Sequence, residues 1–172
     1  EHRSAIRLRA AEAWVAAAAA ALGLASAYWD DSWHTTLGRD SALIPPHLLL
    51  YMSITAVGAV LGIWALRQLR VARSVRVLLR TPGFSLAAAA AAATVLAAPA
   101  DAFWHATFGR DAVLWSPPHL LSVVSTLVLL IALNIGLAPN APQSVRVALA
   151  IPLLGASQIV VMEYDTDVPQ FP

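Results

Sequence analysis

The sequence predicts an all-α, polytopic transmembrane helical bundle with five spans and a duplicated two-helix repeat. Three observations predict this class: 59% of the 172 residues are hydrophobic, only 12% are charged, and five apolar stretches are each long enough to cross a bilayer. Soluble domains carry about 25% charged residues, roughly twice this share. We therefore expect a single membrane domain over residues 1–172, with the lipid bilayer as its main partner.

The predicted spans follow from length, because a helix needs about 20 apolar residues to cross the hydrocarbon core. The five spans cover approximately residues 10–29, 46–66, 84–104, 118–137 and 145–162. Pro152 is expected to kink the last span. The first span resembles a secretory signal peptide, but the third repeats its pattern, and a removable signal has no reason to be duplicated. The chain starts at Glu1 and not at Met, as expected of an excerpt from a longer protein.

Arginine placement predicts the orientation. Two arginines, Arg39 and Arg110, fall on one side of the predicted spans, whereas nine fall on the other: Arg3, Arg7, Arg9, Arg67, Arg70, Arg73, Arg76, Arg80 and Arg146. The arginine-rich side is expected in the cytoplasm, which makes this a multi-pass cell-membrane protein with a cytoplasmic N-terminus. We interpret the arginines between the second and third spans as a topology determinant, with binding of anionic lipid as the alternative.

The composition also excludes several classes of protein. Without any cysteine, disulfide frameworks, thiolate zinc sites and cysteine nucleophiles are excluded. All eleven basic residues are arginines, and they are not interleaved with exposed aromatic residues, so we expect no nucleic-acid partner. The apolar excess excludes intrinsic disorder.

A polar motif occurs twice. The first copy reads DDSWHTTLGRD followed by PPHLL, and the second reads DAFWHATFGRD followed by PPHLL. The offset is 71 residues at Asp30 and Asp101, and 72 residues at His47 and His119. Repeat one covers residues of about 10–66 and repeat two about 84–137, which leaves about 145–162 as an extra helix. Two spans per repeat give both copies the same orientation, so both motifs are expected on the extracytoplasmic side.

Each copy contains one aspartate and two histidines at spacings that suit a metal ion. In the first copy Asp30 and His34 are four residues apart, which places them on one helix face if Gly38 ends the helix. His47 follows a proline pair that starts the returning helix, so it comes back to the same depth. The corresponding residues of the second copy are Asp101, His105 and His119.

One carboxylate and two imidazoles form a ligand set for first-row transition metals, with copper, iron and zinc all open. Ionisable residues in membrane segments usually serve function, which favours a metal site over a purely structural hairpin. The pairs Arg39–Asp40 and Arg110–Asp111 are expected to support the ligands rather than to bind the metal.

Together, the double Asp-x3-His spacing, the returning histidines and the Arg-Asp pairs resemble the C subunit of the copper membrane monooxygenases, the family of particulate methane monooxygenase and ammonia monooxygenase. The resemblance covers about residues 30–121. It implies two adjacent copper sites, one at the first triad and one at the second. It also implies partner subunits in the membrane and periplasm, an oligomer, and oxidation of small hydrophobic substrates. The chain departs from the family at Asp101, where the family uses asparagine.

A second functional class is a membrane factor that transfers or assembles metal without catalysis. The acidic residues near the end, Glu163, Asp165 and Asp167, could gather cations, although a solvated helix end is the simpler interpretation. Transport is disfavoured because the second and fourth spans contain almost no polar residues. No acid–base residue beyond the six candidate ligands is identified, so catalytic residues remain unassigned.

Overall fold

The computed structural model describes residues 6–37, 41–108 and 116–165, without the side chains of residues 34, 35, 160 and 162–165. These residues form six helices: α1 (Ala10–Leu37), α2 (Pro45–Ala72), α3 (Val75–Leu79), α4 (Phe84–Phe108), α5 (Pro117–Gly136) and α6 (Gln143–Asp165).

Four helices of the described part are long and apolar enough to cross a membrane: α1, α2, α4 and α5. They match the first four predicted spans, so the all-α fold of a multi-pass membrane protein is confirmed. α6 forms over the fifth predicted span and contains Pro152, but it is not one of these four helices. A fifth membrane crossing therefore stays a prediction.

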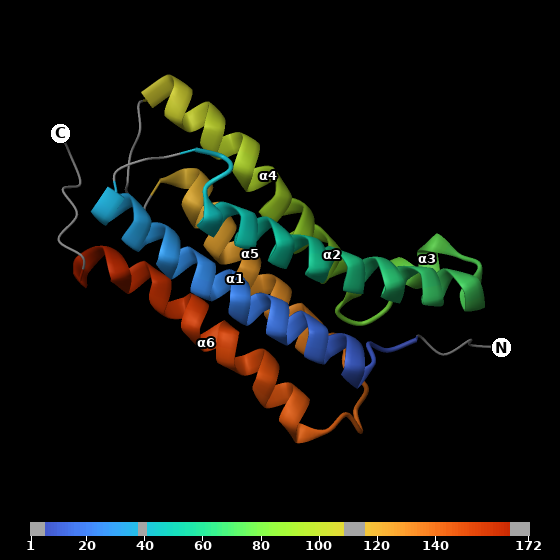
Figure 1. The fold of residues 1–172 in the computed structure, drawn as a ribbon. Coiled ribbons are helices and arrows are strands. Elements are labelled where there is room, and N and C mark those ends of the chain that lie inside the picture. The colour runs from blue at the N-terminus through green and yellow to red at the C-terminus, as the bar shows by residue number, and fades with distance from the viewer. Residues whose placement is uncertain (1–5, 38–40, 109–115, 166–172) are drawn as a thin grey trace.

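Consecutive long helices form two hairpins, the first from α1 and α2 and the second from α4 and α5 (Figure 1). α2 also contacts α4, and α6 lies against α1 and α5. Small side chains fill much of the core where the helices meet. Six alanines on α1 and α4 are at most 5% exposed: Ala13, Ala16, Ala17, Ala87, Ala90 and Ala97. Small side chains let membrane helices approach closely, as the alanine-rich spans predict.

The helices near the motifs extend past the predicted spans or begin at proline pairs. α1 continues to Leu37 and α4 to Phe108, past the predicted span limits of about 29 and 104. Each helix therefore includes the first histidine of its motif, as predicted. The returning helices α2 and α5 begin at proline pairs, where the missing N–H removes no helical hydrogen bond. His47 and His119 consequently lie in first turns.

At the opposite end of the molecule, the N-terminal segment ties the hairpins together. Trp64 of α2 is fully buried and contacts the ring of Phe84 edge-on, with centroids 5.2 Å apart. A Cβ on Gly136 would lie 2.4 Å from the Trp64 ring, so this close approach of α5 needs glycine. Trp64 Nε1 donates to the Ile6 carbonyl at 2.7 Å, and the Leu8 N–H donates to the Gly136 carbonyl at 2.9 Å. Residues 6–8 thus bridge α2 and α5.

Candidate metal centre

Asp101 and His105 lie one turn apart on α4. Asp101 Oδ2 is 3.2 Å from His105 Nε2, the contact that the four-residue spacing predicts. Pro99 precedes this pair inside the helix and has no N–H, so the Val95 carbonyl lacks its usual helical donor. The aspartate therefore stands directly after a locally weakened turn of α4.

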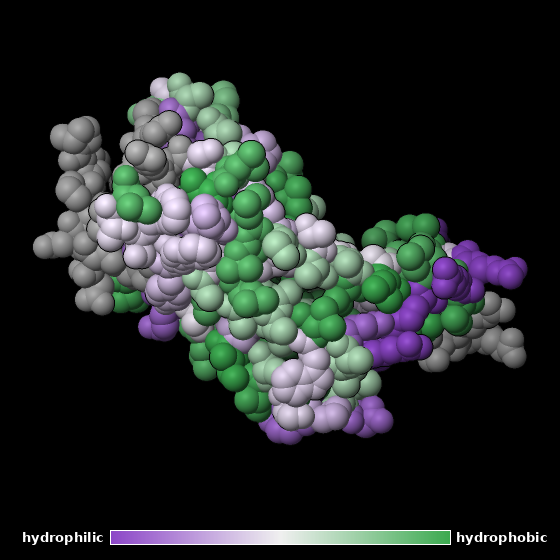
Figure 2. All heavy atoms as spheres, viewed as in Figure 1, coloured by the Kyte–Doolittle hydropathy of each residue, from purple (hydrophilic) through white to green (hydrophobic). Residues whose placement is uncertain are grey.

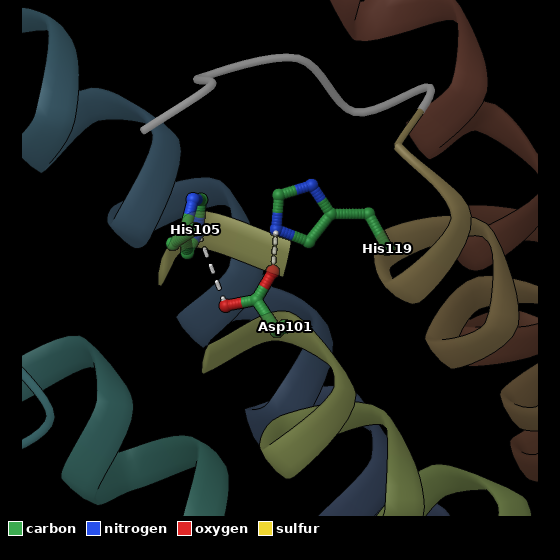
Figure 3. Close-up of side chains that lie close together, drawn as sticks. All are labelled: Asp101, His105 and His119. Atoms are coloured by element: carbon green, nitrogen blue, oxygen red, sulfur yellow. Dashed lines mark ion pairs between the residues drawn. The ribbon is translucent and has the colours of Figure 1, made fainter. Parts of the chain in front are cut away.

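His119 completes the cluster from the first turn of α5. Its Nε2 lies 3.2 Å from Asp101 Oδ1, so the two histidines contact different oxygens of one carboxylate. Figure 3 shows the three side chains pointing toward one another from two helices. The imidazole centroids of His105 and His119 are 6.3 Å apart, with the rings inclined by 64°. The three candidate ligand atoms all lie within 4.8 Å of one another.

Each nitrogen–oxygen separation suits two donors to one metal ion, and a single ion could join both histidines if the carboxylate bound it through both oxygens. Two donors that each lie about 2.1 Å from an ion are about 3.0 Å apart at a right angle and about 3.4 Å apart at a tetrahedral angle. Both nitrogen–oxygen separations of 3.2 Å fall between these limits. Asp101 Oδ1 is also buried without accepting a hydrogen bond of normal geometry. Such a buried carboxylate oxygen is costly unless a cation compensates its charge.

The cluster is accessible from outside the helices. The side chains of Asp101, His105 and His119 are 31%, 21% and 33% exposed. Two large apolar side chains on the same helix, Phe103 and Phe108, are 69% and 66% exposed. An ion or a small molecule can therefore reach this position.

The first hairpin brings two of its three candidate ligands together. Asp30 Oδ1 lies 3.2 Å from His47 Nε2. The opposite ring nitrogen, His47 Nδ1, lies 2.9 Å from the Ser41 carbonyl. Because a carbonyl only accepts, Nδ1 carries the proton, and a neutral ring then turns the Nε2 lone pair toward the carboxylate. This arrangement needs a cation or a proton between the two atoms.

The two hairpins place their polar groups near each other. His47 of the first hairpin is among the groups that act electrostatically on Asp101, together with His105 and His119. α2 and α4, which carry His47 and Asp101, are also in contact. The side chain of His34 lies outside the described residues, so the first triad is described only as the pair Asp30–His47.

Some groups that contact the candidate ligands could not be identified from the sequence motif. The Ser41 carbonyl is a backbone group, and its contact with His47 depends on the loop conformation rather than on residue type. Tyr51, whose ring centroid lies 6.1 Å from that of His47, is four residues further along α2, a spacing that could have indicated it. The predicted supporting pairs Arg39–Asp40 and Arg110–Asp111 lie outside the described residues, as do the side chains of the acidic C-terminal group.

The fold and the cluster define a multi-pass membrane protein with an Asp–His–His group that could hold a metal ion at one end of a helical hairpin. No family model, no curated protein and no solved structure matches the chain. Its function is therefore inferred from the site and the sequence pattern.

Proposed function

We propose that the chain is a membrane copper-binding protein whose centre comprises Asp101, His105 and His119. A single observation carries this proposal: three donor atoms from two helices converge within 4.8 Å, with both histidines 3.2 Å from one carboxylate. An imidazole–carboxylate set without thiolates suits copper, iron or zinc. Copper is preferred because the two motifs resemble those of the C subunit of the copper membrane monooxygenases.

We further propose that Asp30, His34 and His47 form a second centre of the same kind. The contact between Asp30 and His47 has the same 3.2 Å length as the contact between Asp101 and His119. The sequence places His34 at the position that His105 occupies in the second motif. Two adjacent copper centres on the extracytoplasmic side would agree with the resemblance to the C subunit of the copper membrane monooxygenases.

In such a protein a bound copper ion supplies the chemistry that activates dioxygen. The chain itself orients the donors from two helices, and the exposed apolar side chain of Phe108 lies one turn beyond His105 on α4. Small hydrophobic substrates concentrate in the bilayer and could enter from the lipid. Partner subunits in the membrane and periplasm, and an oligomer, belong to this proposal.

A second candidate function is transfer or assembly of metal without catalysis. The exposure of the cluster favours it, because ligands that are 21–33% exposed allow an ion to be handed to a partner. The two functions differ in how firmly the ion is held. A catalytic centre retains copper against a soluble chelator, whereas a transfer site releases it rapidly.

The test is metal analysis of the purified protein in lipid nanodiscs, after separate loading with Cu(I), Cu(II), Fe(II) and Zn(II). We expect the His105→Ala and His119→Ala variants each to lose one equivalent of copper. Thr107→Ala is the matched control, because Thr107 is exposed on the same helix and, among the described residues, its hydroxyl bonds only to the Phe103 carbonyl of that helix. Unchanged metal content in both histidine variants would overturn the proposal, and zinc or iron retained in preference to copper would overturn the choice of metal.

A further inference from the structure

α2 is longer than a membrane crossing requires. Its 28 residues extend about 42 Å at 1.5 Å per residue, about 12 Å more than the hydrocarbon core of a bilayer. The chain then turns at Arg73, which has a left-handed backbone (φ 49°), and continues into the short helix α3. Figure 1 shows that this end of α2 and α3 project away from the other helices. We call residues 70–80 the arginine arm.

The arginines of the arm are exposed and have no acidic partner in the described part of the chain. These residues are Arg70, Arg73, Arg76 and Arg80. Two other arginines show the contrast. Arg67 pairs with Glu12 at 2.5 Å, and Arg146 is held by the Asn134 side chain at 3.1 Å. Within the described residues, the charge of the arm thus forms no ion pair that stabilises the fold.

Large apolar side chains are exposed between these arginines. Val75 and Leu79 are 60% and 55% exposed, and Val71 is 48% exposed. Hydrophilic and hydrophobic residues lie side by side on this projecting end of the molecule (Figure 2). Exposed apolar side chains among cationic ones are typical of elements that lie in the interface of a membrane, where acyl chains and headgroups meet.

We propose that the arginine arm is a binding surface for anionic phospholipid headgroups in the leaflet where α2 ends. Arg70, Arg73, Arg76 and Arg80 contact the phosphates, while Val75 and Leu79 insert between the acyl chains. The position of the arm supports this occupant, since α2 delivers it to the bilayer surface. A topology determinant alone requires only the positive charges, whereas the exposed valine and leucine side chains require an apolar neighbour.

The chain has no cysteine, so a single introduced cysteine can carry a fluorophore that reports polarity. Leu79→Cys labels the arm, and Leu37→Cys is the matched control at the opposite end, since these leucines are 55% and 56% exposed. The labelled full chain is placed in nanodiscs of phosphatidylcholine with increasing phosphatidylglycerol. We expect the emission to shift to the blue at position 79 and to stay constant at position 37. High salt should reverse the shift, because it screens the charges.

Charge variants then separate lipid binding from folding. Each single Arg→Gln change in the arm should raise the phosphatidylglycerol fraction at half-maximal shift about fivefold. Changing all four arginines to Gln should abolish the shift, whereas changing all four to Lys should retain it. Equal emission in both lipids would overturn the proposal. A shift produced by soluble glycerol phosphate in phosphatidylcholine discs would also overturn it, because the surface would then bind small anions rather than the membrane.

Discussion

The two hairpins of the molecule have corresponding contacts but differ in the hydrogen bonds that join their two helices. Several contacts of the first hairpin recur in the second at offsets of 71 residues on the first helix and 72 on the returning helix. The recurring pairs are Asp30–His47 and Asp101–His119, Thr36–Ser32 and Thr107–Phe103, and Ser53–Leu49 and Ser125–Leu121. Corresponding residues therefore make corresponding contacts, which supports the proposed repeat.

The polar bond between the two helices lies at a different depth in each hairpin. In the first, the buried Ser26 hydroxyl donates to the Pro46 carbonyl at 2.5 Å, one turn from Asp30. The second hairpin has the apolar Ala97 at the position corresponding to Ser26. In the described part of this hairpin the hydroxyl bond between the helices joins Thr94 and Ser125, at 2.9 Å and about two turns from Asp101.

This difference assigns different mechanical properties to the two sites. The first hairpin is fixed close to its aspartate, and His47 is held further by the Ser41 carbonyl. In the second hairpin Pro99 interrupts the helical hydrogen bonds between Thr94 and Asp101. We therefore expect the first site to be rigid and the second to adjust its donors around an ion.

The largest expected effect is that of Asp101→Asn. The substitution removes the charge that both His105 and His119 face, while it keeps the shape of the side chain. We expect the copper affinity of the second hairpin to fall by at least about 100-fold, because removing a carboxylate that only supports a ligand already costs up to that much. Isothermal titration in detergent, with metal analysis of the same samples, measures the change.

Asp30→Asn is the comparison variant for this experiment. If the hairpins hold separate ions, Asp30→Asn leaves the affinity of the second hairpin within about twofold of the wild type. A loss of both equivalents in either variant would show instead that the two hairpins share one centre. Retention of both equivalents by Asp101→Asn would contradict the role of the carboxylate as a ligand.

The main features of the fold and the second site could be predicted from the sequence. Four helices follow from apolar stretches, because backbone groups in a bilayer must bond within the segment. The cluster of Asp101, His105 and His119 follows from a four-residue spacing and a proline pair, which are local rules. The same rules place Asp30 and His47 together.

Other features depend on contacts between distant segments and could not be predicted this way. Gln68 lies within an arginine-rich stretch that predicts an exposed linker, yet it is 1% exposed and accepts a hydrogen bond from the Ile6 N–H at 2.5 Å. Glu12 pairs with Arg67 across 55 residues of sequence. Hydropathy also marks where a span is apolar rather than where its helix ends, so α2 continues to Ala72 instead of about Leu66.

A smaller effect is expected for the reciprocal pair Ser26→Ala and Ala97→Ser. Ser26→Ala removes a fully buried hydrogen bond, so the free energy of unfolding should fall by about 1 kcal/mol. Ala97→Ser places a hydroxyl at the corresponding position opposite Pro118 and should raise it by about 0.6 kcal/mol. Both free energies are measured by unfolding the protein in mixed detergent micelles that contain increasing amounts of sodium dodecyl sulfate. Equal destabilisation by the two changes would mean that the hairpins are not equivalent at this depth.

The smallest expected loss of stability is that of Thr94→Val, which removes the hydroxyl bond between the helices of the second hairpin without changing side-chain volume. Ser125 keeps its bonds to the Leu121 and Ser122 carbonyls, so the free energy of unfolding should fall by only about 0.6 kcal/mol. Thr55→Val is the control, because Thr55 is exposed and bonds only to the Tyr51 carbonyl of its own helix.

The same variant tests whether the second site is decoupled from this bond. Thr94 lies about two turns from Asp101, beyond the interruption at Pro99, so Thr94→Val should change copper affinity less than twofold. Ser26→Ala, only one turn from Asp30, should weaken the first site more than Thr94→Val weakens the second. The opposite order would assign the rigid site to the second hairpin, because strain from a lost bond reaches the donors only where the intervening helix is continuous.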